Sequence, residues 1–546
     1  MINFETPLDA FLYWERQIPN KLFLKQPVNG GYVTYTYAEA GVEVRKIAHA
    51  ITSHKLPKHS HVALLSKNCA HWILADLAIM ISGFVSIPIY PTLNSVSINQ
   101  ILIHSESKLI IVGKLDDYEN QKEGITEIPR ISVALYGQSD GQLWEDIIKD
   151  TNSIDYDHKQ LANDLHTIIY TSGTTGVPKG VMHSSGNLMV SARTLTKLFN
   201  LPPNLKLFSY LPLAHVAERV MINAGVVLGG TISFTESLET FSKDLEQTQP
   251  HLFFAVPRIW TKFREKILES IPQKKLNLLL AIPILKDIVK NKLKQKLGLK
   301  EAMFVVSAAA PISASLISWY RKIGITIFQG YGMTEDCCVS HFNTNEHDKI
   351  GTVGKTLYNV QVKLSSEGEI CVKNNCLMKG YFKEPEITAS VFDQEGYLKT
   401  GDIGEFDHDG FLTITGRVKD QFKTDKGKYI SPSHIELMMS KNTNIEQICI
   451  VGTGIPQPIA LITLSVSGDT KDKEVLISSL EDSIKLVNRG LEKHEKIEKV
   501  VVMKEDWNVA NGLTTPTMKV KRTHIEKIHK AYYKSWFDMN ESVIFE

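Results

Sequence analysis

The sequence predicts an α/β protein with a large N-terminal domain and a smaller α+β domain after it, and two observations lead to this. Short apolar runs rich in β-branched residues alternate with helical patterns of roughly 10–15 residues, which is typical of parallel sheets. After Gly351 the pattern changes to short strands separated by tight turns. The runs expected as parallel strands are Val62–Leu65, Phe84–Ile89, Leu109–Val112, Thr167–Tyr170, Leu207–Leu211, Phe253–Val256, Phe304–Ser307 and Thr326–Phe328.

Beyond Gly351, alternating runs bounded by polar turns predict a small antiparallel sheet or barrel. A shorter α+β pattern then continues to the end of the chain. We expect the boundary at Gly416–Asp420, which gives an N-terminal domain of residues 1–417 and a C-terminal domain of residues 418–546. The expected antiparallel strands are Gln361–Leu364, Glu369–Val372, Gly404–Asp407 and Phe411–Thr415.

Composition excludes several classes of protein. The chain has 546 residues, of which 43% are hydrophobic and 22% charged, so a large core is expected and whole-chain disorder is not. Lys plus Arg number 61 and Asp plus Glu 60, and this balance gives no general reason to bind nucleic acid. The six cysteines match neither a zinc pattern nor a disulfide scaffold, which predicts a reducing, cytoplasmic location.

No signal peptide or membrane span is expected from the sequence. The first residues lack a basic segment followed by an apolar one. The longest apolar stretch, Trp72–Pro91, is interrupted by Asp76, Gly83 and Pro88. This pattern therefore predicts a buried helix that leads into a strand.

A glycine-rich loop, Tyr170–Gly180, follows the apolar run Thr167–Tyr170. Its glycines let the backbone approach a ligand closely, and its hydroxyl groups, backbone N–H groups and Lys179 suit anionic oxygens. The spacing is neither that of a Walker A loop nor that of a dinucleotide fingerprint. A generic loop of this composition would be a surface loop about as often as a phosphate site.

This eleven-residue string resembles the signature loop of the adenylate-forming superfamily, which includes acyl-CoA synthetases, nonribosomal-peptide adenylation domains and luciferases. The resemblance implies that the loop contacts the phosphates of ATP and that Thr174 also contacts Mg²⁺. The nucleotide-binding residues implied here are Thr171, Ser172, Gly173, Thr174, Thr175, Gly176 and Lys179.

Three further motifs each follow an expected strand. Leu211–His215 ends in a histidine that borders the carboxylate substrate in the superfamily, although a lone histidine there is more often structural. In Ser307–Pro311 small residues leave room for a flat ring, and in Gln329–Glu335 the Glu335 carboxylate suits Mg²⁺. The resemblance implies catalytic roles for His215, Thr334 and Glu335, a metal role for Glu335, and nucleotide contacts by Ala309, Ala310, Pro311, Gln329, Gly330, Tyr331, Gly332, Met333 and Thr334.

The later motifs resemble the ribose site and the hinge of the superfamily. Asp402, in Tyr397–Asp402, offers two acceptor oxygens to a vicinal diol, although Thr-Gly-Asp alone reads as a turn. By the resemblance, Arg417 contacts the ribose, Lys419 is the pivot and Lys423 approaches the phosphates. Asn511–Arg522 resembles the motif of the mobile catalytic lysine, which its register places at Lys519, with Lys521 as the alternative.

The resemblance covers nearly the whole chain and is nearest to bacterial long-chain fatty acyl-CoA synthetases. It implies two parallel α/β sheets plus a small antiparallel β-barrel in the large domain, and a mobile C-terminal domain. The implied reaction joins a fatty acid to coenzyme A through an acyl-adenylate, with ATP and Mg²⁺ as cofactors. An acyl-AMP ligase that serves a carrier protein and a non-catalytic nucleotide-binding protein are the alternatives, and a homodimer is a further expectation.

A basic, partly apolar segment spans residues 274–300. It contains eight lysines against Asp287 alone, and its first half is almost wholly apolar, with a kink expected at Pro283. Such a segment can lie at a membrane interface, because lysines are attracted to anionic lipid. The alternative is a helical hairpin that packs on the large domain with solvated lysines.

Overall fold

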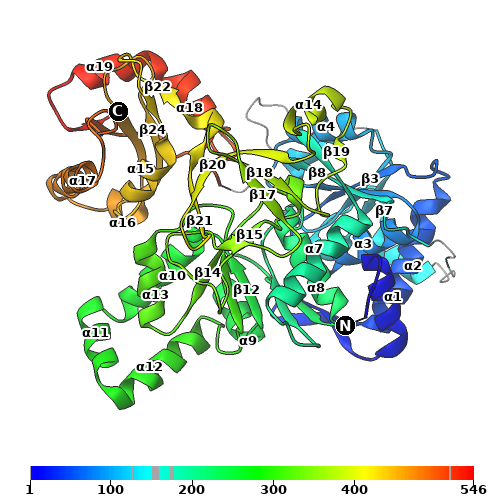
Figure 1. Cartoon of the computed structure of the whole chain (residues 1–546). Coiled ribbons are helices and arrows are strands. Elements are labelled where there is room, and N and C mark those ends of the chain that lie inside the picture. The colour runs from blue at the N-terminus through cyan, green and yellow to red at the C-terminus, as the bar shows by residue number, and fades with distance from the viewer. Residues whose placement is uncertain (1, 126, 151–155, 157–158, 172–177, 516–517) are drawn as a thin grey trace.

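The computed structural model describes residues 2–125, 127–150, 156, 159–171, 178–515 and 518–546 (Figure 1). Mixed sheets and the helices around them form a large N-terminal part, and a smaller C-terminal part lies beside it (Figure 1). The expected α/β class is confirmed. In the described part of the chain, no helix combines the length and apolar character needed to cross a bilayer.

The first sheet has eight strands in the order β19-β9-β8-β4-β3-β5-β6-β7. The run from β8 to β7 is parallel, whereas β9 and β19 are added antiparallel at one edge. The strands are β3 (His61–Leu65), β4 (Val85–Ile89), β5 (Leu109–Val112), β6 (Arg130–Ser132), β7 (Gln142–Leu143), β8 (Leu165–Thr171), β9 (Lys179–Ser184) and β19 (Gly380–Tyr381).

Two further groups of strands form the second layer. One has the order β10-β11-β1-β2 and the other β12-β13-β14-β15-β16. They lie side by side, because the His251 N–H before β12 donates to the Lys206 carbonyl of β10 at 3.0 Å. The strands are β1 (Leu22–Val28), β2 (Gly31–Thr36), β10 (Lys206–Ser209), β11 (Thr231–Phe234), β12 (Leu252–Ala255), β13 (Phe304–Ser307), β14 (Ile327–Tyr331), β15 (His341–Phe342) and β16 (Lys355–Thr356).

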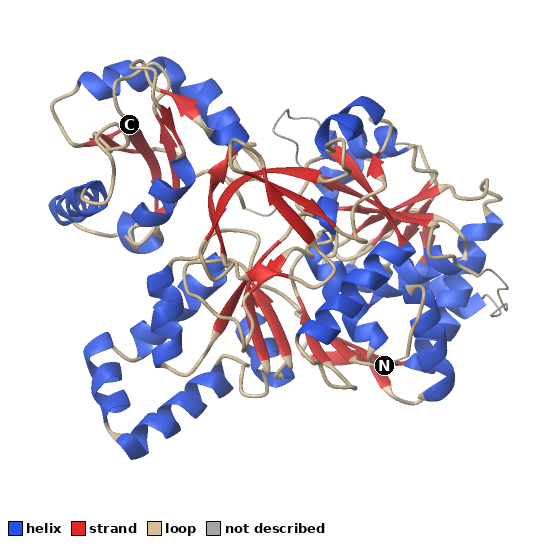
Figure 2. Cartoon of the chain, viewed as in Figure 1, coloured by secondary structure: helices blue, strands red, loops and turns tan. Residues whose placement is uncertain are grey.

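Helices lie on the outside of the sheets and between them (Figure 2). Every residue of α3 (Ala70–Ile81) is buried, because this helix contacts β3 and β4 of the first sheet and β1 of the second. The stretch Trp72–Pro91 is thus a buried helix that leads into β4, as predicted. The other helices of the large part are α1 (Pro7–Gln17), α2 (Tyr37–Ser53), α4 (Ser95–Ser105), α5 (Tyr118–Gln121), α6 (Trp144–Asp150), α7 (Ser185–Leu198), α8 (Val216–Val227), α9 (Phe241–Thr248), α10 (Pro257–Ser270), α11 (Gln273–Ala281), α12 (Pro283–Lys296), α13 (Ala314–Lys322) and α14 (Pro385–Val391).

The third sheet is antiparallel, with the order β17-β18-β20-β21. β17 and β21 are its outer strands, and next to β21 an isolated bridge joins Phe411 to Lys355 of β16. Of the expected antiparallel sheet or barrel, the described residues form a sheet. β20 begins at Leu398 rather than Gly404, so Asp402 lies inside a strand and not in a turn. Gly401, with φ of 75°, and a register shift after Ile403 accommodate this extension. The strands are β17 (Gln361–Leu364), β18 (Glu369–Lys373), β20 (Leu398–Phe406) and β21 (Leu412–Arg417).

The C-terminal part contains its own four-stranded sheet, in the order β24-β25-β26-β27. Successive residues of these strands, such as Ile450 and Val451, enter two different hydrophobic clusters on the two faces of the sheet. Arg258 of α10 forms an ion pair with Glu446 of β24 and so joins the two parts. The elements are β22 (Phe422–Lys423), β23 (Tyr429–Ile430), β24 (Ile445–Val451), β25 (Ile459–Leu464), β26 (Lys499–Val502), β27 (Val543–Phe545), α15 (Pro432–Met439), α16 (Val466–Asp469), α17 (Lys473–Asn488), α18 (Arg522–His529) and α19 (Tyr533–Asp538).

Candidate active site

The glycine-rich loop connects two paired strands. Thr171 at the end of β8 pairs with Lys179 at the start of β9, so the two ends of the loop lie next to each other. The Lys179 ammonium lies 5.2 Å from the ring centroid of Tyr381. Ser172, Gly173, Thr174, Thr175 and Gly176 lie outside the described residues, so the proposed Thr174 contact to Mg²⁺ stays a prediction.

Tyr381 holds the carboxylate of Glu335. The Tyr381 hydroxyl donates to Glu335 Oε1 at 2.8 Å, and the Met378 N–H donates to the Glu335 carbonyl at 2.8 Å. Burial raises the pKa of the Glu335 carboxyl, and the hydrogen bond from Tyr381 opposes that rise. A buried carboxylate that accepts one hydrogen bond and keeps further lone pairs suits a hard divalent cation.

The backbone around Thr334 is fixed on β9. His183 donates from Nε2 to the Thr334 carbonyl at 2.8 Å, and burial lowers the pKa of His183 to about 4, so the ring is neutral. The turn itself is tight, since a Cβ at Gly332 would lie 2.5 Å from the Cα atom of Cys338. These contacts connect the return strand of the glycine-rich loop with the turn that carries Thr334.

Asp336 stabilises this turn from inside. It is fully buried, its Oδ1 accepts the Met333 N–H at 2.8 Å, and burial raises the pKa of its carboxyl to about 7. Its Oδ2 has no hydrogen-bond partner among the described residues. The side chain next to Glu335 thus caps the backbone of the turn.

Asp402 of β20 connects its own strand to β14 and β21. The Tyr331 hydroxyl of β14 donates to Oδ2 at 2.7 Å, and Arg417 Nε of β21 donates to Oδ1 at 2.7 Å. Asp402 is buried whereas the Arg417 side chain is half exposed. The carboxyl group of Asp402, the ring of Tyr331 and the guanidinium of Arg417 thus lie together where a ribose could bind. Each carboxyl oxygen of Asp402 keeps a lone pair for a further hydrogen bond.

The segment after β13 forms part of the same region. Ala309 adopts φ of 70°, and Ala310 and Pro311 are exposed. Ser307 at the end of β13 pairs with Gln329 of β14, and Ser307 Oγ and Gln329 Oε1 are buried without a hydrogen-bond partner among the described residues. Buried polar atoms without a partner are rare, so a polar ligand group at this strand edge would satisfy them. Gly330, also on β14, faces the ring of Phe342.

His215 and Lys519 are brought together from distant parts of the sequence. His215 is the N-cap of α8, where its Nδ1 accepts the Ala217 N–H at 3.2 Å. Burial, and then the positive charge of Lys519, lower the pKa of His215 to about 4. The histidine is therefore neutral and lies within electrostatic range of the lysine.

Lys519 lies on a turn of the C-terminal part. Thr514 pairs with Val520, and the Lys519 N–H donates to Thr515 Oγ1 at 3.1 Å. Residue Lys519 is exposed overall, yet its ammonium group lies among protein atoms, and this burial lowers its pKa. Arg417 lowers the pKa further, whereas Asp402, Cys338 and Glu335 raise it. The Lys519 ammonium group therefore lies within electrostatic range of the residues around Asp402 and Glu335.

The remaining predicted residues lie apart from these contacts. Lys419 is exposed on the short helix η4 (Val418–Asp420), and Lys423 packs its ammonium 5.5 Å from the centroid of Tyr429. Lys521, the alternative to Lys519, lies just before α18, and its N–H donates to the Leu513 carbonyl at 2.8 Å.

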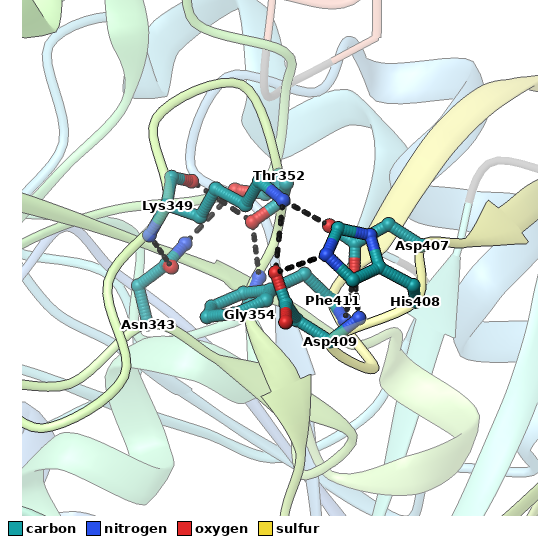
Figure 3. Close-up of polar contacts among 8 residues, drawn as sticks. All are labelled: Asn343, Lys349, Thr352, Gly354, Asp407, His408, Asp409 and Phe411. Carbon is teal, nitrogen blue, oxygen red and sulfur yellow. Dashed lines mark hydrogen bonds and ion pairs between the residues drawn. The ribbon is translucent and has the colours of Figure 1, made fainter.

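A polar cluster fixes the hairpin that carries Asp402 and Arg417 (Figure 3). Lys349 Nζ contacts Asp407 at 2.6 Å and Asp409 at 3.5 Å in the turn between β20 and β21. The Lys349 N–H donates to Asn343 Oδ1 at 2.9 Å, and the Asn343 N–H donates to the Gln329 carbonyl at 2.9 Å. The cluster thus connects the end of β14 with the hairpin.

Three of these positioning residues were absent from the sequence prediction, namely Tyr381, His183 and Lys349. Tyr381 follows Gly380, whose φ of 137° favours glycine, and this pair is the only local signal that the segment is constrained. For His183 and Lys349 no local pattern separates a structural contact from an ordinary polar residue.

Comparison with known proteins identifies both parts of the chain. Residues 12–382 match the AMP-binding enzyme family, and residues 419–538 match the AMP-binding enzyme C-terminal domain. The long-chain-fatty-acid–CoA ligase FadD15 of Mycobacterium bovis is 28% identical over 569 aligned residues, which cover 93% of each protein. Long-chain-fatty-acid–CoA ligase 5 of Mus musculus is 29% identical and covers 89% of this chain and 81% of the relative.

Solved structures share the fold at lower identity. The adenylation domain of the carboxylate reductase of Mycobacterium chelonae superposes with a TM-score of 0.80 at 19% identity, over 98% of this chain and 91% of that one. The o-succinylbenzoate CoA synthetase of Bacillus subtilis, solved with its acyl-adenylate intermediate, gives 0.76 at 21% identity, over 95% and 97%. The family match spans more than half of the chain, and the protein therefore belongs to the AMP-binding enzyme family.

Proposed function

We propose that this protein activates a long-chain fatty acid with ATP and transfers the acyl group to coenzyme A. The carboxylate would attack the α-phosphate to give acyl-AMP and pyrophosphate, and the coenzyme A thiol would then displace AMP. The observation that carries the proposal is that Lys519 lies within electrostatic range of both His215 and Asp402. The long-chain acid is inferred from relatives whose names state that substrate.

In the first half-reaction an anion approaches a polyanion, so positive charge is the main requirement. Lys519 would stabilise the charge that develops at the α-phosphate, and Lys179 with residues 171–176 would hold the departing pyrophosphate. Glu335 and Thr174 would hold Mg²⁺, which supplies further positive charge to the phosphates. The neutral His215 would border the carboxylate without adding a charge that competes for it.

We propose that Asp402 accepts the ribose hydroxyls with help from Arg417, and that the aromatic face of Tyr331 packs on the adenine. Ala309, Ala310, Pro311 and the segment 329–334 would form the remaining walls of the nucleotide site. Lys423, which packs against Tyr429, would reach the nucleotide only after the C-terminal part moves.

For the second half-reaction we propose that residues 418–546 rotate as a domain against residues 1–417 about Lys419. The exposed position of Lys419 on η4, directly after β21, suits a pivot. The rotation would withdraw Lys519 and open a path for the coenzyme A thiol.

The direct test is pyrophosphate release with MgATP across saturated acids from acetate to stearate, plus benzoate, with and without coenzyme A. Turnover that requires both a long-chain acid and coenzyme A is the expected result. A single burst without coenzyme A and no turnover with it would favour a carrier-protein acceptor. The absence of pyrophosphate release with every acid would contradict an acyl-ligase function.

Two variants test the separate roles proposed for Lys519 and Lys419 in the two half-reactions. Lys519→Ala should slow acyl-AMP formation about a hundredfold or more while sparing thioester formation from supplied acyl-AMP. Lys419→Pro should do the reverse, because proline restricts the backbone at the pivot. Equal loss of both half-reactions in either variant would contradict the proposed roles.

We also propose a cytoplasmic location, which the free cysteines among the described residues support. A homodimer stays a prediction, which equilibrium sedimentation of the purified chain would test.

A further inference from the structure

Helices α11 and α12 project from the large part as a hairpin with an apolar tip (Figures 1 and 2). Pro283 begins the second helix rather than bending a continuous one. The apolar tip consists of exposed large side chains within eleven consecutive residues, namely Leu278, Ile282, Ile284, Leu285 and Ile288. Among them Leu278 is 64% exposed and Ile284 is 79% exposed. Apolar side chains gathered in this way mark an interaction surface.

The outward direction of the tip follows from helical periodicity. Val289, Leu293 and Leu297, each four residues after the last, turn inward and pack against the core around α10 and α13. Ile284 and Ile288 share the opposite face of α12, and no residue of this helix is buried. α12 therefore has one apolar face that is docked on the protein and a second that is free.

Exposed lysines lie on both helices of the hairpin. Lys274, Lys275, Lys286 and Lys292 are exposed, and none of them has an ion pair among the residues that the structure describes. By contrast Lys296 pairs with Glu246 at 3.1 Å. Two further lysines, Lys290 and Lys294, lay their stems against Gly324 at the end of α13 and are half buried.

We propose that the hairpin docks the protein on an anionic lipid bilayer. The apolar tip would enter the boundary between headgroups and acyl chains, and the four unpaired lysines would lie at the lipid phosphates. A second copy of the chain fits less well, because two such basic surfaces repel each other. Nucleic acid would attract the lysines but would leave the tip in water.

The proposed membrane docking is inferred from the residues of the hairpin alone, so it does not depend on the ligase reaction. Its value to the enzyme does rest on the proposed function, because a long-chain acid partitions into bilayers and would be captured there. The structure thus assigns to this hairpin the role of bringing the protein to the phase that holds its substrate.

The test is partition of the full chain onto phosphatidylcholine vesicles with and without phosphatidylserine, measured by sedimentation. Wild type should bind the anionic vesicles, and less so as salt rises. Lys286→Gln with Lys292→Gln should weaken the partition roughly 30-fold, by the usual contribution of two surface lysines. Ile284→Ser with Ile288→Ser should weaken it roughly tenfold or more, because the inserted apolar area is lost.

Matched controls change the same residue types elsewhere. Lys58→Gln with Lys149→Gln removes two exposed lysines, and Leu238→Ser with Val466→Ser removes two apolar side chains that are 84% and 85% exposed. Equal loss in the control and hairpin variants, or wild-type binding by both hairpin variants, would overturn the proposal.

A third outcome would also overturn it: displacement of the protein from vesicles by short duplex DNA, with the isoleucine variant binding that DNA as wild type does. Pyrophosphate release with coenzyme A and a long-chain acid carried on serum albumin, without vesicles, should be unchanged in every hairpin variant. If the proposed function is wrong, the wild-type protein would release no pyrophosphate in that assay, whereas its partition onto vesicles would be unaffected.

Discussion

The hydrogen bond from Tyr381 to Glu335 allows a quantitative test of the metal role of Glu335. Tyr381→Phe removes the hydroxyl that donates to Oε1 at 2.8 Å and keeps the ring, with which Lys179 interacts. Since Glu335 is buried, no solvent readily replaces the lost donor. The variant should therefore weaken the ionised carboxylate specifically, without repacking the site.

The magnitude follows from the kind of bond. A hydrogen bond to a charged group contributes about 1.5–3 kcal/mol. The pKa of Glu335, already raised by burial, should rise further, so a proton competes better with Mg²⁺. The Mg²⁺ concentration that gives half-maximal activity should increase roughly 10- to 150-fold at the pH where protonation matters.

The assay is pyrophosphate release against Mg²⁺ concentration at several pH values between 6 and 9. The deficit of Tyr381→Phe should shrink as pH rises, because the carboxyl ionises without help. Tyr32→Phe, which removes a surface hydroxyl bonded to Gln247 at 2.5 Å, is the control and should behave as wild type. A deficit that is independent of pH and of Mg²⁺ would refute the reasoning.

Three other predictions concern the turn and the buried charges. Gly332→Ala would place a Cβ 2.5 Å from the backbone of Cys338, so the turn must shift and pyrophosphate release should fall about a hundredfold while the melting temperature changes little. Arg219→Met leaves the buried carboxylate of Asp76 without the guanidinium that binds it at 2.7 Å, and urea unfolding should show a loss of about 3–5 kcal/mol; a wild-type midpoint would contradict this. His183 is held neutral with its pKa at about 4, below the unfolded value, so its contribution to stability is complete above about pH 6.5 and falls as pH decreases toward 4. Between pH 7 and pH 5 this loss should be roughly 2 kcal/mol, and His183→Gln should flatten the measured slope by that amount.

The local pattern of apolar and polar residues in the sequence was sufficient to predict much of the fold. The apolar runs predicted as strands all lie within or across observed strands, and Leu109–Val112 and Phe304–Ser307 match to the residue. Such runs are informative because a strand buried on both faces must be apolar throughout. The strand β20 was predicted too short, because Gly401 and polar side chains at its start resemble a turn.

Contacts between distant segments could not be predicted from pattern. Tyr381 reaches Glu335 because the two-residue strand β19 pairs with β9, and a strand of that length has no periodicity. In the basic segment, composition alone could not distinguish Lys290, which lies against Gly324, from Lys292, which is exposed. The bridge from Phe411 to Lys355 at the side of the third sheet likewise depends on pairing between distant segments and not on the residues of any one strand.

One short hairpin carries two roles that are energetically linked. Asp402 and Arg417 are directly paired across β20 and β21, and η4 begins one residue after Arg417. Any ligand that competes for the Asp402 oxygens also changes the partner of Arg417, which directly precedes the C-terminal part. By thermodynamic reciprocity, the factor by which a nucleotide shifts the orientation of that part equals the factor by which orientation shifts nucleotide affinity. Affinities measured with the C-terminal part held in one orientation, by a cross-link for example, would therefore report its conformational preference directly.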